Sequence, residues 1–164
     1  MSSVMQPKVV PVQGRKYQLR KLPAVEGSFI YMRMMGAIYK ASGEQAAASH
    51  RAPARAHDRH AEPEVPPEMT AEQRVRALCT SGFMHLGHED FVAIQTACLK
   101  AVSRVETLNG TETPMPVMTD QGEWVPVQGD WEHIGANAYL AQLLAMEVCV
   151  DSLGCFFSET AKAT

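Results

Sequence analysis

The chain has 164 residues, a mass of 18.0 kDa and 46% hydrophobic residues, which is enough for one domain with a real core. Its formal net charge is −3, and its Lys and Arg residues are scattered among acids, so the sequence argues against a nucleic-acid partner. No apolar run approaches the roughly 18 residues that span a bilayer, and the N-terminus has no apolar signal core, so we expect a cytosolic protein with no membrane partner.

Residues 1–41 predict a β-hairpin followed by a helix. Gln13-Gly14 has turn chemistry between two β-prone runs, so residues 8–12 and 16–20 are expected to pair, with Pro11 placing the first strand at a sheet edge. Residues 24–41 carry two apolar rows at helical spacing, which favours a helix with a wide apolar face. One row holds Val25, Phe29, Met32, Gly36 and Tyr39, and the other holds Ile30, Met34 and Ile38.

Residues 42–69 contain four of the ten prolines and no aromatic residue, so they are interpreted as a flexible linker or insertion. Residues 70–164 are expected to complete the same single domain. Thr70 and Gln73 have the spacing of a capping box, which predicts a helix over 70–80 that Gly82 helps to end.

Two longer helices are predicted at 89–104 and 131–152, where apolar residues repeat at helical intervals. Between them, 115–118 and 123–127 flank a turn and predict a second small hairpin, which Pro116 and Pro126 would confine to edge strands. The fold class is therefore α+β and predominantly α-helical, with about four helices and small flanking β-hairpins.

No residue pattern predicts catalysis or a cofactor. Cys79, Cys98, Cys149 and Cys155 lie in apolar segments without CxxC spacing, which is typical of buried free thiols and not of activated nucleophiles. The acidic pair Glu89-Asp90 is better explained by the dipole of a helix start than by acid-base chemistry. We therefore expect no enzyme.

A metal site is the sharpest chemical alternative, because Cys79, His85 and His88 fall within ten residues. The spacing Cys-x5-His-x2-His matches no standard zinc finger, and His57 and His60 lie in the predicted linker. The sequence thus predicts no metal. A helix-turn-helix over 70–104 is disfavoured as well, because its turn is too long.

Four stretches carry a resemblance to a known family: RKYQLRKLPAVEGSFIYMRMMGAIYKA, FVAIQTACLKAVSRVE, TPMPVMTDQGEWVPV and LAQLLAMEVCVDSLGCFFSE. In this order they resemble the tail assembly chaperones of long-tailed bacteriophages. The resemblance implies a protein of the host cytoplasm that binds the tape-measure protein, keeps it soluble and helps tail-tube protein polymerise around it. It also implies absence from the mature virion.

The resemblance supplies no residue-level site, so candidate client contacts come from apolar side chains expected at the surface. These are Phe29, Met34, Met35, Phe156 and Phe157. Self-association through the same surface is compatible with the sequence, but no heptad pattern sets a number of subunits. The alternative function is a small phage or prophage inhibitor that binds a host protein.

Overall fold

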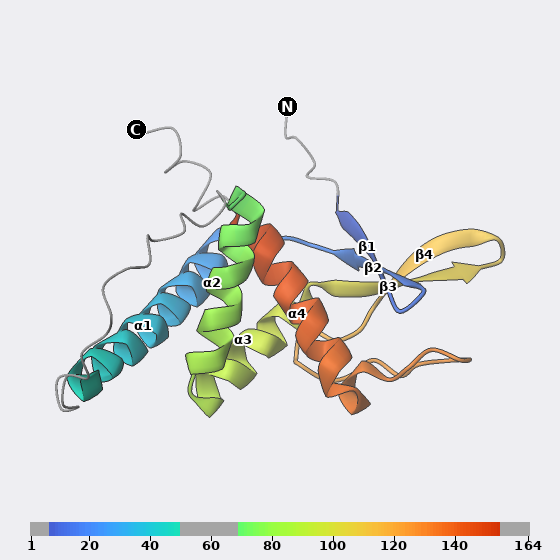
Figure 1. The fold of residues 1–164 in the computed structure, drawn as a ribbon. Helices are drawn as coiled ribbons and strands as arrows, with labels where there is room; N and C mark the ends of the chain where they lie inside the picture. Colours follow the sequence, from blue (N-terminus) through green and yellow to red (C-terminus); the bar gives the residue numbers. More distant parts are fainter. Residues whose placement is uncertain (1–6, 50–68, 155–164) are drawn as a thin grey trace.

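A computed structural model describes residues 7–49 and 69–154 of the chain. Within these ranges the fold is α+β with helices predominating, which confirms the predicted class. Figure 1 shows the helices gathered at one side and the sheet at the other. The elements are β1 (Lys8–Val12), β2 (Arg15–Leu19), α1 (Ala24–Ser49), α2 (Ala71–His85), α3 (His88–Lys100), β3 (Val102–Leu108), β4 (Thr111–Pro116), a 3-10 turn η1 (Ile134–Ala136) and α4 (Ala138–Leu153).

The sheet is an antiparallel meander in the order β1-β2-β3-β4, with α1, α2 and α3 inserted between β2 and β3. Its two hairpins turn at Gln13-Gly14 and Asn109-Gly110, whose φ angles of 52°, 76°, 51° and 79° suit the tight turns that match strand twist. The first hairpin was predicted and is confirmed. Both edge strands contain proline, namely Pro11 in β1 and Pro114 and Pro116 in β4.

Strand β3 corrects the helix predicted over 89–104. Helix α3 ends at Lys100, and the Ala101 amide donates to the Cys98 and Leu99 carbonyls. The segment that follows contains three β-branched residues, Val102, Val105 and Thr107, and its pairing with both β2 and β4 outcompetes continuation of the helix.

The hairpin predicted from 115–118 and 123–127 forms only around its turn. Residues Thr111–Pro116 form β4 and pair with β3 instead. All that remains of the expected pairing is a single bridge between Met118 and Trp124. The Asn109-Gly110 turn between β3 and β4 directs this arrangement.

Helix α1 continues to Ser49, eight residues beyond the predicted helix end, while residues 50–68 lie outside the described part of the chain. Helix α2 begins with the predicted capping box: the Gln73 amide donates to Thr70 Oγ1 at 3.2 Å, and the Thr70 amide donates to Gln73 Oε1 at 2.8 Å. However, α2 does not end near Gly82. It continues to His85, and Gly82 lies buried against Met34 of α1.

Helix α4 begins at Ala138, not at Trp131, because the Asn137 side chain caps it by accepting from the Leu140 amide at 2.9 Å. The preceding loop is tied to β2 instead. Trp131 meets Tyr17 edge-on at 5.8 Å, and Arg15 lies 4.9 Å over the Trp131 ring. These contacts explain why a segment with helical spacing is not helical.

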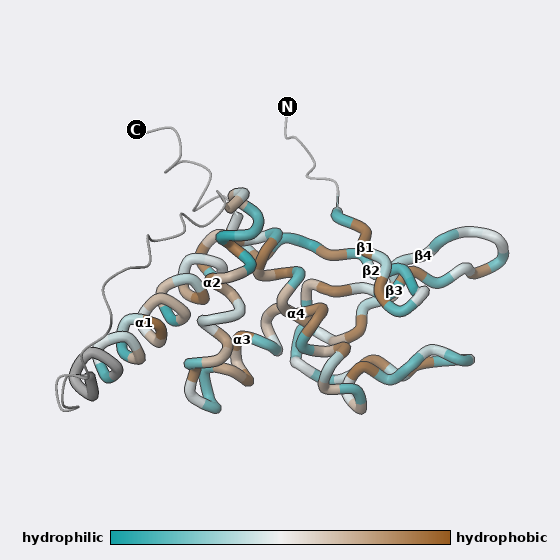
Figure 2. The backbone as a smooth tube through the Cα atoms, in the orientation of Figure 1, coloured by the Kyte–Doolittle hydropathy of each residue, from teal (hydrophilic) through white to brown (hydrophobic). Residues whose placement is uncertain are grey.

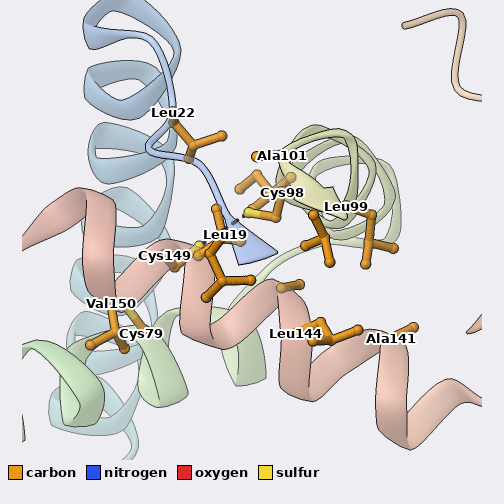
Figure 3. Close-up of a cluster of buried hydrophobic side chains, with 14 of the residues drawn as sticks. Leu19, Leu22, Cys79, Cys98, Leu99, Ala101, Ala141, Leu144, Cys149 and Val150 are labelled. Carbon is orange, nitrogen blue, oxygen red and sulfur yellow. Dashed lines mark hydrogen bonds between the residues drawn. The ribbon is translucent and has the colours of Figure 1, made fainter. Parts of the chain in front are cut away.

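The core forms where α4 meets the other helices and the inner strands. Figure 2 shows mainly hydrophobic colours along α4, and Figure 3 shows Leu144 and Cys149 of α4 facing Leu19 of β2 and Leu99 of α3. At the far end of α4, the Leu22 amide donates to Ser152 Oγ at 3.0 Å, which fixes the start of α1. None of the helices in the described ranges is long and apolar enough to cross a membrane.

The tight contact between α1 and α2 predicts that Gly82→Ala destabilises the protein. A Cβ at position 82 would lie 2.8 Å from both Cβ and Cγ of Met34, so the two helices must separate. Overpacking outweighs the gain in helix propensity, and we expect the free energy of unfolding in urea to fall by about 1–2 kcal/mol.

The matched control is Gly43→Ala in α1, where a new Cβ meets nothing within 4 Å. That variant should gain about 0.5–1 kcal/mol, because alanine suits a helix better than glycine does. Equal stability of the Gly82→Ala and wild-type proteins would refute the proposed close contact.

Candidate functional site

Helix α1 carries more of the exposed large hydrophobic side chains than any other element of the described chain. Val25, Phe29, Met32 and Tyr39 are exposed by 85%, 50%, 67% and 69%, and Gly36 lies between the last two. At about 100° per residue these five positions fall on one line of the helix. We call this set the α1 row. In Figure 1, α1 lies at the outer edge of the group of helices.

The second apolar row of α1 faces the opposite way and is buried. Ile30 and Met34 are almost completely inaccessible, and Met34 packs against Gly82 of α2. One apolar face of the helix therefore packs in the core, and the other is exposed to solvent. Two apolar faces on one surface helix exceed what the fold itself requires.

The structure shows which of the client contacts proposed from the sequence are exposed and which are buried. Phe29 is exposed in the α1 row, and Met35 is partly buried at its flank. Met34 is a core residue, so it cannot meet a client while α1 and α2 stay packed, which corrects its assignment to the surface. Phe156 and Phe157 lie outside the described residues.

Val25, Met32 and Tyr39 are site candidates that the sequence reasoning did not single out. The sequence does contain a signal for these three residues, since they share a row with Phe29 at helical spacing. The sequence alone could not show which of the two rows faces the core. Only the contact with α2 assigns Ile30 and Met34 to the core and the other row to the surface.

Charged side chains flank the α1 row on one side. Arg33 Nη1 lies 3.4 Å from Asp90 Oδ2 of α3, and its guanidinium lies 5.0 Å over the Phe29 ring. Glu26 and Lys40 occupy the same flank one heptad before and after Arg33. Within the described residues, neither Glu26 nor Lys40 forms an ion pair.

A second apolar surface is a groove of about 560 Å³ between α2, α3 and α4. Gln95 and Gln142 cross it with a hydrogen bond of 3.0 Å. Trp124 packs so closely on Gly135 that a Cβ there would lie 2.7 Å from the indole ring. Further apolar side chains in the lining are Phe83, Met84, Phe91, Ile134 and Met146.

Three cysteines meet in the core and do not form a reactive site. Cys98 Sγ lies 3.3 Å from Cys149 Sγ, and Cys149 also shares a side-chain hydrogen bond with Cys79. The hydrogen bond to Cys149, together with burial, raises the pKa of Cys79. At Cys149, the Cys79 hydrogen bond lowers the pKa, but the bond to Cys98 and burial outweigh it and raise the pKa overall. The raised pKa keeps the Cys79 and Cys149 thiols protonated, and all three cysteines are buried, as inert core residues are.

The histidines considered as possible metal ligands do not come together with Cys79 either. His85 ends α2 and His88 begins α3, both are exposed, and Cys79 is buried away from them. Across residues 7–49 and 69–154, no three His, Cys, Asp or Glu side chains come together as metal ligands. What the described surface offers is apolar area on a helix, which suits reversible binding of another apolar helix.

The chain belongs to the phage tail assembly chaperones. The family described as "Phage tail assembly chaperone protein, TAC" matches residues 13–163, which is nearly the whole chain and includes the segment 42–69. The resemblance drawn from the sequence is thereby confirmed. No curated protein and no solved structure matches the chain. Membership in this family implies binding to tail proteins.

The thiol cluster predicts slow chemistry with a thiol reagent. In a Cys155→Ser background, Cys79, Cys98 and Cys149 should react with Ellman's reagent at least about 10³-fold more slowly in native protein than in denaturant, because reaction must wait for the core to open. Absorbance at fixed reagent concentration measures the rate. Fast release of one equivalent from native protein would show an accessible thiolate and contradict the buried cluster.

Proposed function

We propose that this member of the phage tail assembly chaperone family binds the tape-measure protein through the α1 row, keeps it soluble and promotes tail-tube assembly around it. The observation that carries the proposal is the bare apolar face of α1, opposite a face already committed to the core. A tape-measure protein that presents apolar helix faces needs them covered before the tube encloses it. A helix that presents a second apolar face can supply that cover.

Binding of this kind needs many modest contacts and no bond chemistry. Phe29 and Tyr39 supply flat aromatic area at low cost in side-chain entropy, while Met32 adapts to clients of different shape. Because no single residue dominates, arriving tail-tube subunits can displace the chaperone stepwise. We therefore propose a non-enzymatic protein that requires no cofactor.

The place of action follows from the same role. A protein that holds the tape-measure protein before the tube closes acts in the host cytoplasm and leaves when its surface is displaced. We propose that it is absent from the mature virion. Mass spectrometry of purified particles checks this, and stoichiometric peptides of the chain in virions would argue against a transient role.

The main test is co-expression with a tagged tape-measure protein from the same genome, followed by pull-down and measurement of the soluble fraction. Wild-type chain should co-purify and raise tape-measure solubility. Phe29→Glu should lower the co-purified amount by about tenfold, because it places a charge in the centre of the apolar contact.

Met84→Glu is the control, because Met84 is exposed by 77% but lies on α2 at the groove. It should bind like wild type. The opposite result, in which Met84→Glu abolishes binding and Phe29→Glu does not, would assign the client to the groove. A tight stoichiometric complex with a host enzyme, with no effect on the tape-measure protein, would favour the inhibitor.

A further inference from the structure

The spacing of the α1 row points to a specific occupant when no client is present. From Val25 the row continues through Phe29, Met32, Gly36 and Tyr39 to Gly43, at intervals of four, three, four, three and four residues. This is the heptad spacing of a coiled-coil seam. It was hidden in the sequence by Ile30, Met34 and Ile38, which the structure assigns to the opposite side.

We propose that the α1 row pairs with the α1 row of a second copy of this chain, in antiparallel orientation about a two-fold axis at Arg33. Figure 1 shows α1 at the outside of the helices. Because Ile30 and Met34 face inward, the bodies of the two copies would lie on opposite sides of the helix pair. The interface is isologous, so the same residues serve both copies and the assembly closes as a dimer.

The residues of the row fit one another in this register. Phe29 of one copy meets Tyr39 of the other, and each Met32 lies over Gly36 of its partner copy. No side chain of the described protein lies within 4 Å of a Cβ built at Gly36, so this glycine leaves room for a methionine. Val25 meets Gly43 at both ends. Met32 and Val25 thus oppose glycines, and the Phe29 and Tyr39 rings oppose each other, which allows close packing along the interface.

Charge supports the same register. Glu26 of one copy faces Lys40 of the other, and symmetry repeats the pair. Arg33 faces its own counterpart at the axis, where Asp90 of the same chain lies 3.4 Å away and offsets the like charge. A parallel pair would instead set Arg33 and Lys40 against Ser28 and Met35, with no opposite charges.

Sliding the antiparallel pair by one heptad gives a poorer fit. Glu26 would then face Arg33, but Arg33 is already engaged with Asp90. Tyr39, which is exposed by 69%, would also lose its partner. The register with the longer overlap of the two helices covers every large side chain of the row, so it is the one we propose.

The dimer would also regulate the proposed client site, and only that consequence rests on the proposed function. A second copy and a client would cover the same row, so each excludes the other. The row would be hidden until a tape-measure helix competes for it. The dimer itself is tested without any client, so a failure of client binding and a failure of self-pairing give separate results.

Sedimentation velocity of the purified full chain over a range of concentrations tests the pairing. Wild type should shift from monomer to dimer as concentration rises. Met32→Glu should raise the dimer dissociation constant at least about tenfold by placing charges at the seam. Met84→Glu, an equally exposed methionine outside the row, should leave it unchanged. A wild-type chain that stays monomeric throughout, or a Met32→Glu protein that dimerises normally, would overturn the proposal.

Charge exchange tests the register. Glu26→Lys and Lys40→Glu should each weaken the dimer, because each sets like charges opposite one another twice, whereas the double variant should recover wild-type affinity. Thermal unfolding followed by circular dichroism checks that each monomer remains folded. Weakening by Glu26→Lys with no effect of Lys40→Glu, or a double variant weaker than both singles, would overturn the antiparallel register.

Discussion

The close contact between Met34 and Gly82 sets the rotation of α1 about its own axis, and much of the surface follows from it. Only a residue without a Cβ lets the two helices approach this closely at that point. Once Met34 lies in that gap, Ile30 must face the core and Phe29 must face outward. A helix with two apolar faces could pack either way, and this one contact decides which face is free.

Other parts of the fold act to hold that helix in place. The start of α1 is fixed by the hydrogen bond from the Leu22 amide to Ser152 at the end of α4. Its middle is fixed by Gly82, and its flank by the Arg33–Asp90 pair with α3. On the far side of the core, the buried Arg104 joins Glu106 and the Pro126 carbonyl, which anchors the long loop after β4 to the sheet. The exposed row therefore stands on a rigid support.

Local chemistry made several elements predictable from sequence. The Gln13-Gly14 turn and the Thr70–Gln73 capping box act through neighbouring residues alone, and both are confirmed. Predictions failed where contacts with residues distant in the sequence determine the secondary structure. Val102 and Val105 fit a helix by spacing, but β2 and β4 provide strand partners for that segment. Residues 131–137 fit a helix as well, but Trp131 is held by Tyr17 and Arg15 of β2.

The candidate site was predictable only in part for the same reason. The sequence located apolar surface on the first helix and chose Phe29 correctly as an exposed residue, but it could not tell the inner row from the outer one and so chose Met34 as well. The heptad spacing became visible only after the inner row was assigned. A pattern of period 3.6 fixes which residues share a face, whereas the choice of buried face depends on the neighbouring helix.

The prolines at both edges of the sheet limit the ways in which the chain can stick to others. Pro11, Pro114 and Pro116 have no amide hydrogen, so neither β1 nor β4 offers an unbroken ladder to an incoming strand. A protein that works beside unfolded or newly made chains is exposed to strand-by-strand aggregation. Here the sheet is poorly suited to recruit such chains, and the proposed binding surface lies on a helix, where contact can be reversed.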